Sequence, residues 1–271
     1  MNEDTDFKFL LEKIHRNKGA DFSLYRTGTL KRRIDSRIRA AGCADYPDYI
    51  VYLNKNPQEY DRLIEAITIN VTEFFRNPET FDVLAKKVIP EIIRTKKEQG
   101  KKIIRAWSAG TSNGEEAHSL AILFLEALRE NRADFDVKVH GTDIDPACIE
   151  KARAGIYTAA SVKEINKETL EKYFNKNGEN YEINDSVKNL ARFTVHNLAC
   201  DEFLSHLDLI LCRNVVIYFT KPLQEMVYNN FARTLNKDGF LVLGKVESLC
   251  SFAQKHFITF DNRERIYRKR E

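Results

Sequence analysis

The sequence predicts an α/β protein in which a small all-α N-terminal domain precedes a doubly wound, mostly parallel β-sheet. Three observations support this prediction. Apolar residues recur at helical spacing through residues 1–76, strands and helices alternate within residues 101–271, and the chain ends in two short strands joined by a turn. Repeated strand–helix–strand units with short connections are typical of a doubly wound sheet, and the final pair predicts an antiparallel C-terminal strand.

The same patterns predict where the domains begin and end. Residues 1–76 form the helical domain, residues 77–100 a charged linker helix that is interrupted at Pro90, and residues 101–271 the sheet domain. Residues 158–190 are polar and break the alternation of strands and helices. We therefore expect a small inserted subdomain there.

Composition excludes several classes of protein. The chain has 271 residues with 43 Lys+Arg and 40 Asp+Glu, and this near-neutral balance argues against nucleic-acid binding. The longest uncharged apolar-rich stretch, residues 117–125, is too short to cross a bilayer, so we expect a cytoplasmic protein without direct membrane insertion. The five cysteines and six histidines lack the short spacings of disulfide scaffolds and zinc sites, so no metal is expected.

The helical domain contains a concentrated positive charge. Residues 26–39 hold six basic side chains and one acid, while apolar residues recur every fourth position, which predicts an amphipathic helix that ends near Gly42. The basic face is either simply solvated or the docking surface for an acidic partner. The docking candidates are Arg32, Arg33, Arg37 and Arg39.

The strands and helices of the sheet domain follow in order along the chain. We expect strands at residues 102–107, 137–142, 192–196, 208–212 and 240–243, and a C-terminal hairpin at residues 257–260 and 265–268. We expect helices at residues 115–130, at residues 146–155 with Asp145 as N-cap, and from Pro222 to about residue 238.

Two strand ends carry candidate ligand-binding residues. The first strand leads into a loop with Gly110 and Gly114, which is followed by Glu115 and Glu116. Glycines allow a tight turn close to a ligand, and acids after them suit a cationic group better than a pyrophosphate. The acids also favour a helix N-terminus through the helix dipole, which is a purely structural explanation for either one.

The second strand ends at Asp143, and a carboxylate at that position typically binds ribose hydroxyls. Asp143 could instead be a helix cap, with Asp145 as the ligand-binding acid. Because ligands of doubly wound sheets bind at the carboxyl ends of the strands, the glycine loop and the acid together suggest an adenosine-type cofactor.

Four motifs in order carry a resemblance to a known family. They are INVTEFFR at residues 69–76, WSAGTSNGEE at 107–116, GTDID at 141–145 and CRNVVIYF at 212–219. With them, the chain resembles the CheR chemotaxis-receptor glutamate methyltransferases over nearly its whole length. The sequence departs from the family pattern at residues 111–113 and at Ala117-His118, but these departures remove no glycine or acid of the site.

The resemblance implies a class I methyltransferase (Rossmann-like) sheet, S-adenosylmethionine as methyl donor and S-adenosylhomocysteine as product. It implies Arg76 and Tyr218 as catalytic residues, although Tyr218 could equally be core packing. The cofactor-binding residues that it implies are Asn70, Thr72, Arg76, Gly110, Glu116, Asp143, Asn197, Leu198, Arg213 and Asn214. A glutamate carboxylate is ionised at pH 7 and needs no general base, which agrees with this set.

The resemblance also implies a partner, the cytoplasmic helical bundle of methyl-accepting chemoreceptors, which would dock on the basic helix. We expect a monomer, and we expect no tethering to a receptor C-terminal peptide, because residues 175–181 are shorter than a glycine-rich tethering loop. The alternative function is a non-catalytic S-adenosylmethionine-binding regulator that acts through its N-terminal domain.

Overall fold

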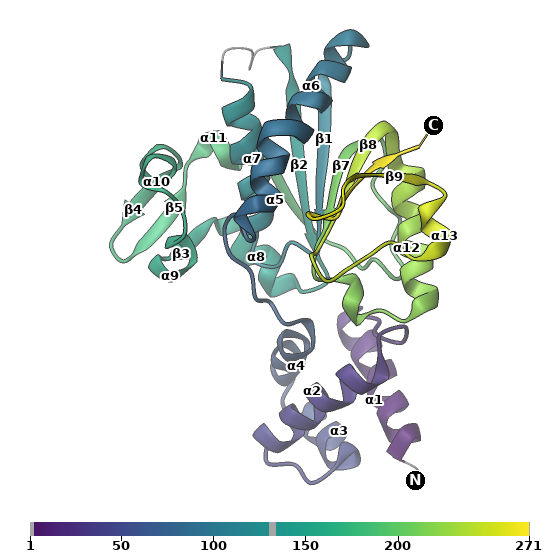
Figure 1. Cartoon of the computed structure of the whole chain (residues 1–271). Coiled ribbons are helices and arrows are strands. Elements are labelled where there is room, and N and C mark those ends of the chain that lie inside the picture. The colour runs from purple at the N-terminus through teal and green to yellow at the C-terminus, as the bar shows by residue number, and fades with distance from the viewer. Residues whose placement is uncertain (1–2, 130–133, 271) are drawn as a thin grey trace.

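The computed structural model describes residues 3–129 and 134–270. A helical domain lies below one end of a β-sheet, and a small subdomain projects from the side of the sheet (Figure 1). The helical domain consists of α1 (Glu3–Lys18), α2 (Thr27–Ala40), α3 (Tyr46–Lys55) and α4 (Glu59–Thr68). Its helices meet at a fully buried core that includes Leu10, Ile34, Tyr49 and Leu63, so their apolar faces are shared as the spacing predicted.

Residues 69–77 differ from the prediction that the helical domain is helical to residue 76. The last helix ends at Thr68, and the backbone is left-handed at Ile69 (φ 49°), Phe75 (φ 52°) and Asn77 (φ 60°). This conformation is uncommon for residues other than glycine and is concentrated at ligand sites, where surrounding contacts maintain it. The segment therefore crosses between the domains as irregular backbone.

The predicted linker helix, residues 77–100, packs on the sheet. It consists of α5 (Pro78–Val83), a π-helical turn (Leu84–Val88) and α6 (Ile89–Glu98). The π-turn precedes Pro90, which lacks the N–H that a regular α-helix needs there. Leu84 and Ile92 are buried with β1 residues in one core, so this segment is physically part of the sheet domain.

The main sheet has seven strands in the order β6-β2-β1-β7-β8-β10-β9. All neighbours from β6 to β8 are parallel, and β10 is antiparallel to both β8 and β9. The strands are β1 (Ile103–Ala109), β2 (Asp136–Asp143), β6 (Ala191–Val195), β7 (Leu207–Cys212), β8 (Leu235–Leu243), β9 (Phe257–Asp261) and β10 (Ile266–Lys269). The predicted doubly wound sheet with an antiparallel C-terminal strand is confirmed.

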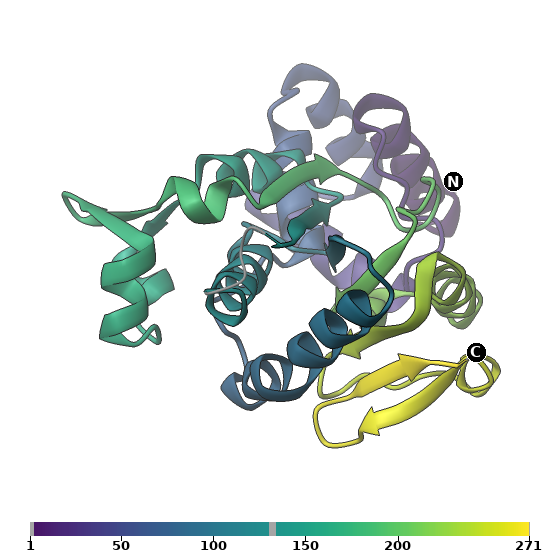
Figure 2. The same ribbon diagram turned by 90° about the horizontal axis from the view of Figure 1, so that it is seen from above.

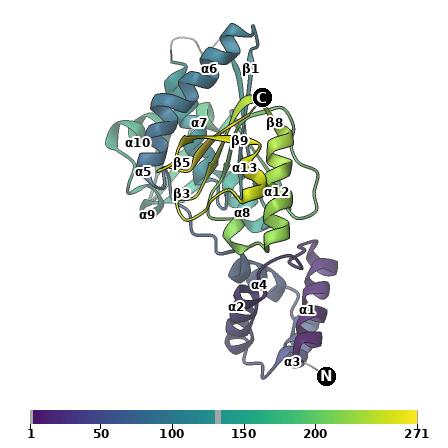
Figure 3. The same ribbon diagram turned by 45° about the vertical axis from the view of Figure 1, so that its right-hand side comes forward.

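Helices cover both faces of this sheet (Figures 2 and 3). On one face, α7 (Glu115–Ala127) and α8 (Pro146–Ala154) pack with α5 and α6, and on the other lie α12 (Lys221–Thr234) and α13 (Ser251–Gln254). Successive residues of each central strand alternate between the two cores, as in a strand buried on both sides. The prediction that the helix from Pro222 reaches residue 238 is wrong, because Leu235 already pairs with Leu207 and starts β8.

The inserted subdomain is a second, three-stranded sheet in the order β3-β5-β4. It contains β3 (Ile156–Thr158), α9 (Ala159–Val162), α10 (Lys167–Tyr173), β4 (Phe174–Asn177), β5 (Asn180–Ile183) and α11 (Asp185–Lys188). Tyr157 and Phe174 pack edge-on against Phe74, with ring centroids 4.8 and 5.1 Å away. The subdomain therefore helps to hold the irregular segment that follows α4.

The two domains also meet at an isolated antiparallel bridge. Tyr25, just before α2, pairs with Phe219, and their ring centroids are 4.9 Å apart. The Arg26 N–H donates to the Tyr218 carbonyl (2.8 Å), and the Thr220 N–H donates to the Leu24 carbonyl (3.0 Å). Nowhere in residues 3–129 and 134–270 does a helix combine the length and apolar content needed to span a bilayer.

Candidate active site

A pocket of about 250 Å³ lies between the helical domain and the carboxyl edge of the sheet. One wall comes from residues 67–76 and the other from the loops that follow β1, β2, β6 and β7. The sequence-predicted site residues in its lining are Asn70, Thr72, Arg76, Gly110, Glu116, Asp143, Leu198, Arg213, Asn214 and Tyr218. Strand ends and one interdomain segment thus bring together residues that are distant in the sequence.

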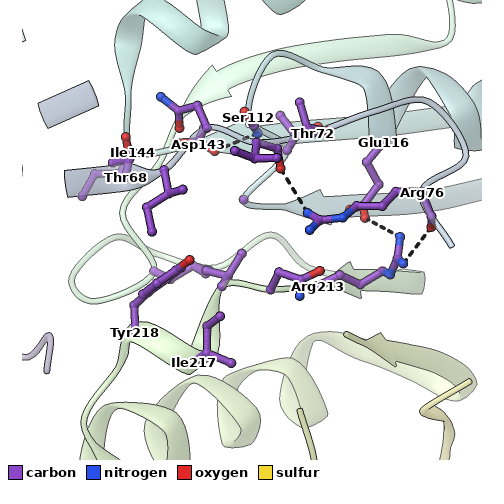
Figure 4. Close-up of a pocket in the computed structure, with 18 of the residues that line it drawn as sticks. Thr68, Thr72, Arg76, Ser112, Glu116, Asp143, Ile144, Arg213, Ile217 and Tyr218 are labelled. Carbon is purple, nitrogen blue, oxygen red and sulfur yellow. Dashed lines mark hydrogen bonds and ion pairs between the residues drawn. The ribbon is translucent and has the colours of Figure 1, made fainter. Parts of the chain in front are cut away.

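Asp143 is fixed at the end of β2 by two backbone amides. Its Oδ2 accepts a hydrogen bond from the Ser112 N–H (2.8 Å) and its Oδ1 from the Asp145 N–H (3.1 Å). Burial raises the pKa of Asp143 to about 6, although the amides oppose the shift. Each oxygen has a further lone pair, so this carboxylate can still accept hydroxyl groups of a ligand. Figure 4 shows it across the pocket from Tyr218.

Of the two acids Asp143 and Asp145, Asp145 has the structural role. Its Oδ1 accepts from the Ala147 N–H (2.9 Å) and caps α8, while its Oδ2 accepts from the Asn70 side-chain amide (2.8 Å). Asp143 lines the pocket and Asp145 does not. The geometry therefore favours Asp143 as the ligand-binding acid and makes Asn70 a link between the two walls.

Glu116 and Arg213 form an ion pair at the far end of the pocket (Figure 4). Glu116 Oε1 accepts from the Ser108 hydroxyl (2.7 Å), and its Oε2 lies 3.2 Å from Arg213 Nη1. Arg213 is almost fully buried, and its Nη2 donates to the Arg76 carbonyl (2.8 Å) and to Asn77 Oδ1 (2.6 Å). Arg213 thus joins the strand-end wall to the interdomain segment, and its charge is compensated within the protein.

Arg76 is held more loosely than Arg213. Its Nη1 donates to the Val71 carbonyl (3.0 Å), and within residues 3–129 and 134–270 it has no carboxylate in ion-pair contact. The guanidinium lines the pocket and is only partly buried. Its planar group of donors is consequently available to an anionic ligand group.

The loop after β1 leaves almost no space for side chains at its glycines. Gly110 has φ +82°, and a Cβ there would lie 2.3 Å from Val215 Cγ2; Gly114 has φ +95°, and a Cβ there would lie 2.7 Å from the Ala152 Cβ. The hydroxyls of Thr111 and Ser112 are buried beside this pocket, and neither has a hydrogen-bond partner among residues 3–129 and 134–270. Buried hydroxyls are normally satisfied, so these two fit a polar ligand in the pocket.

Asn197 does not line the pocket, in contrast to the position implied for it. It is buried, its Oδ1 accepts from the Ala199 N–H (2.9 Å), and its Nδ2 donates to the Asp21 carbonyl (3.4 Å). These contacts stabilise the loop after β6 and its approach to the helical domain.

Tyr25 and Ser112 are among the lining residues that were not singled out from the sequence. Ser112 lies within the glycine loop, so its backbone contact with Asp143 could have been anticipated from the loop. Tyr25 comes from the turn before α2 and packs on Phe219. No local pattern indicates that contact, because the partner is nearly two hundred residues away.

The four arginines of the predicted docking helix fall into two pairs. Arg37 pairs with the buried Glu59, and Arg33 donates to the Ala66 carbonyl (3.0 Å). Arg32 and Arg39 are exposed. Arg32 and Arg39 are therefore the exposed members of the predicted docking set, while Arg33 and Arg37 make contacts within the helical domain itself.

The strand order, the glycine loop after β1 and the acid at the end of β2 define a class I, S-adenosylmethionine-dependent methyltransferase. The unpartnered hydroxyls and the close approach at Gly110 fit this cofactor. Asp143 would hold the ribose and Glu116 the methionine end.

The chain belongs to the CheR methyltransferase family. Residues 5–68 match the model of the CheR all-alpha domain, and residues 70–266 match that of the CheR S-adenosylmethionine-binding domain. S-adenosylmethionine is therefore the cofactor, as the sequence-based resemblance predicted.

Two similar proteins are named chemotaxis protein methyltransferases, which is consistent with this family. The chain is 33% identical over 259 residues to a chemotaxis protein methyltransferase of Listeria innocua, covering 96% of both chains. It is 31% identical over 260 residues to that of Salmonella typhimurium, covering 93% of this chain and 86% of the relative. A solved TehB-like SAM-dependent methyltransferase from Corynebacterium glutamicum aligns over 71% of this chain and 97% of its own at 16% identity and a TM-score of 0.38.

Proposed function

We propose that this chain transfers the methyl group of S-adenosylmethionine to glutamate side chains of chemoreceptors in the cytoplasm, forming methyl esters and S-adenosylhomocysteine. The observation that carries the proposal is the contrast between the two pocket arginines. Arg213 is compensated by Glu116, whereas Arg76 lines the pocket with one bond to a backbone carbonyl. An anionic acceptor such as a carboxylate would supply the missing partner for Arg76.

The chemistry needs alignment more than acid–base catalysis. When bound, the cofactor supplies an electrophilic methyl group on a sulfonium; the acceptor oxygen forms a bond to that carbon as the carbon–sulfur bond breaks. Arg76 would orient the acceptor carboxylate, and Tyr218 would close the opposite side of the pocket. Because a glutamate is ionised at pH 7, no proton has to be removed from it. The acceleration of methyl transfer would come from positioning of the reactants and from exclusion of water.

The acceptor proposal also draws on the relatives, which are named chemotaxis protein methyltransferases. A helical bundle rich in acidic residues would meet the exposed Arg32 and Arg39 of α2. We propose that the protein acts as a monomer in this encounter.

One assay tests the acceptor. The protein is incubated with methyl-labelled cofactor and receptor-rich membranes, and the labelled protein is then treated with alkali. We expect label that is released as methanol, because esters hydrolyse in alkali while N-methyl groups survive. Alkali-stable label would indicate a different acceptor atom. Absence of label despite measured cofactor binding would favour a non-catalytic regulator.

A further inference from the structure

A buried carboxylate outside the pocket lining fixes one wall of the pocket. Glu247 is 4% exposed and lies in the turn after β8. Its Oε2 accepts from the N–H groups of Asn214 (2.8 Å) and Gly244 (2.6 Å), and its Oε1 accepts from the Val215 N–H (3.0 Å). Within residues 3–129 and 134–270 no Lys, Arg or His forms an ion pair with it, so backbone amides stabilise this charge.

Two of the three amides that Glu247 binds, those of Asn214 and Val215, begin the loop that forms the pocket wall after β7. Asn214 has φ +61°, a left-handed conformation that a non-glycine residue adopts only when its surroundings maintain it. Val215 packs so closely on Gly110 that a Cβ there would lie 2.3 Å from it. Asn214, Val215 and Tyr218 all line the pocket.

We propose that Glu247 is a positioning residue for methyl transfer, which acts by holding the loop of residues 214–218 against the cofactor loop. This inference rests on the methyltransferase class of the chain and is independent of the acceptor. The carboxylate bridges two strand ends, those of β7 and β8, that would otherwise present three unpaired amides.

Two variants disturb this contact in different ways. Glu247→Gln keeps the size of the side chain, but its single carbonyl oxygen leaves an NH₂ group facing one of the three backbone donors. Gly244→Ala keeps the carboxylate and adds a methyl group 2.6 Å from Glu247 Oε2 and 2.9 Å from the Asn214 nitrogen. Both changes should release residues 214–218 while the contacts of Asp143 and Glu116 stay in place.

The matched control is Glu264→Gln. Glu264 is similarly buried, at 2% exposure, and it also lies outside the pocket lining. Its Oε2 accepts from the Thr80 hydroxyl (2.6 Å) and lies 3.6 Å from Lys245 Nζ, so it contacts side chains where Glu247 contacts backbone amides. A general cost of removing a buried carboxylate should appear in this control as well.

The experiment measures amide hydrogen exchange of residues 213–218, the dissociation constant of S-adenosylhomocysteine and the rate of methyl transfer per cofactor-binding site. In both test variants we expect at least tenfold faster exchange, about tenfold slower transfer and a dissociation constant within threefold of the wild type. The control should change none of these quantities more than twofold.

Unchanged exchange in both variants would overturn the proposal, and so would unchanged transfer with faster exchange. Exchange and cofactor binding require no acceptor protein. If the wild type does not methylate receptors, the proposed acceptor fails while the exchange arm still decides the role of Glu247.

Discussion

The two walls of the pocket are built differently. On the strand-end wall, Asp143 and Glu116 each have both oxygens engaged, by backbone amides or by Ser108 and Arg213. On the interdomain wall, the only hydrogen bond of the Arg76 side chain within residues 3–129 and 134–270 is to a carbonyl five residues away, and the backbone around it is left-handed at several positions. The first wall is organised before any ligand binds, and the second has donors left for one.

This difference suggests a division of labour. Preorganised acids suit a cofactor that binds in every catalytic cycle with the same geometry. A partly exposed arginine on a segment between two domains suits an acceptor that arrives on a large partner. Changes to Asp143 or Glu116 on the strand-end wall should therefore affect cofactor affinity, and changes to Arg76 on the interdomain wall should affect transfer.

The largest effect is expected where the walls are joined. Arg213→Met should lower the free energy of unfolding by about 3 kcal/mol, because it leaves the partly buried Glu116 without its cation and releases residues 76–77. Thermal and denaturant unfolding measure this loss. The control Arg94→Met removes a surface arginine that pairs with Glu91 and Glu98, and should cost less than about 1 kcal/mol. Similar losses in the two variants would contradict the role of Arg213 as a link.

Arg76→Ala tests whether the interdomain wall serves methyl transfer and the strand-end wall serves cofactor binding. We expect transfer to fall about 100-fold, or roughly 2.7 kcal/mol, with cofactor affinity within threefold of the wild type, since Arg76 would orient the acceptor carboxylate. Steady-state rates and calorimetry with S-adenosylhomocysteine give the two quantities. Equal losses in both would place Arg76 on the carboxylate of the cofactor instead.

Asp143→Ala should show the opposite pattern. Loss of the ribose hydrogen bonds should weaken cofactor binding by roughly 1.5–3 kcal/mol. Calorimetry measures it, with Asp136→Ala as control, because Asp136 lies at the other, exposed end of the same strand. Unchanged affinity in Asp143→Ala would rule out the ribose assignment.

Cofactor affinity should also depend on pH through the same carboxyl group. Because burial raises the pKa of Asp143 to about 6, the free protein loses the ionised acceptor as pH falls below that value. If only the ionised form binds, the dissociation constant should rise about tenfold between pH 7 and pH 5. Asp143→Asn should lack this dependence.

Glu115 needs a separate control, because burial raises its pKa to about 7. The buried His118 has its pKa lowered to about 3 and stays neutral over this range. The pH dependence should persist in Glu115→Gln; its disappearance there would assign the titration to Glu115.

The sequence predicted the parts of the fold that depend on local signals. Asp145 followed by Pro146 marks the start of α8 and Gly155 its end, and both are observed, because capping needs only neighbouring residues. The sequence also predicted that Asp143 and the glycine loop lie beside each other. They follow two neighbouring parallel strands, and such strands end at the same edge of the sheet.

What could not be predicted depends on tertiary contacts. Residues 69–77 read as helical, and their left-handed backbone is maintained by distant partners such as Asp145 for Asn70 and Arg213 for Asn77. The spacing of α2 identified its polar face. It could not show that Arg37 pairs with Glu59, which is buried and lies on another helix.

The smallest effect is expected at the exposed arginines of α2. Arg32→Glu combined with Arg39→Glu should reduce receptor methylation about threefold at low salt, because exposed charges contribute mainly to encounter and orientation. The difference should shrink as added salt shortens the range of electrostatic interactions, and cofactor affinity should not change. Lys8→Glu with Arg16→Glu makes the same charge change on the exposed surface of α1 and serves as the control. An equal loss in both double variants would mean that net charge, and not the face of α2, attracts the acceptor, and the interdomain wall would then carry the recognition alone.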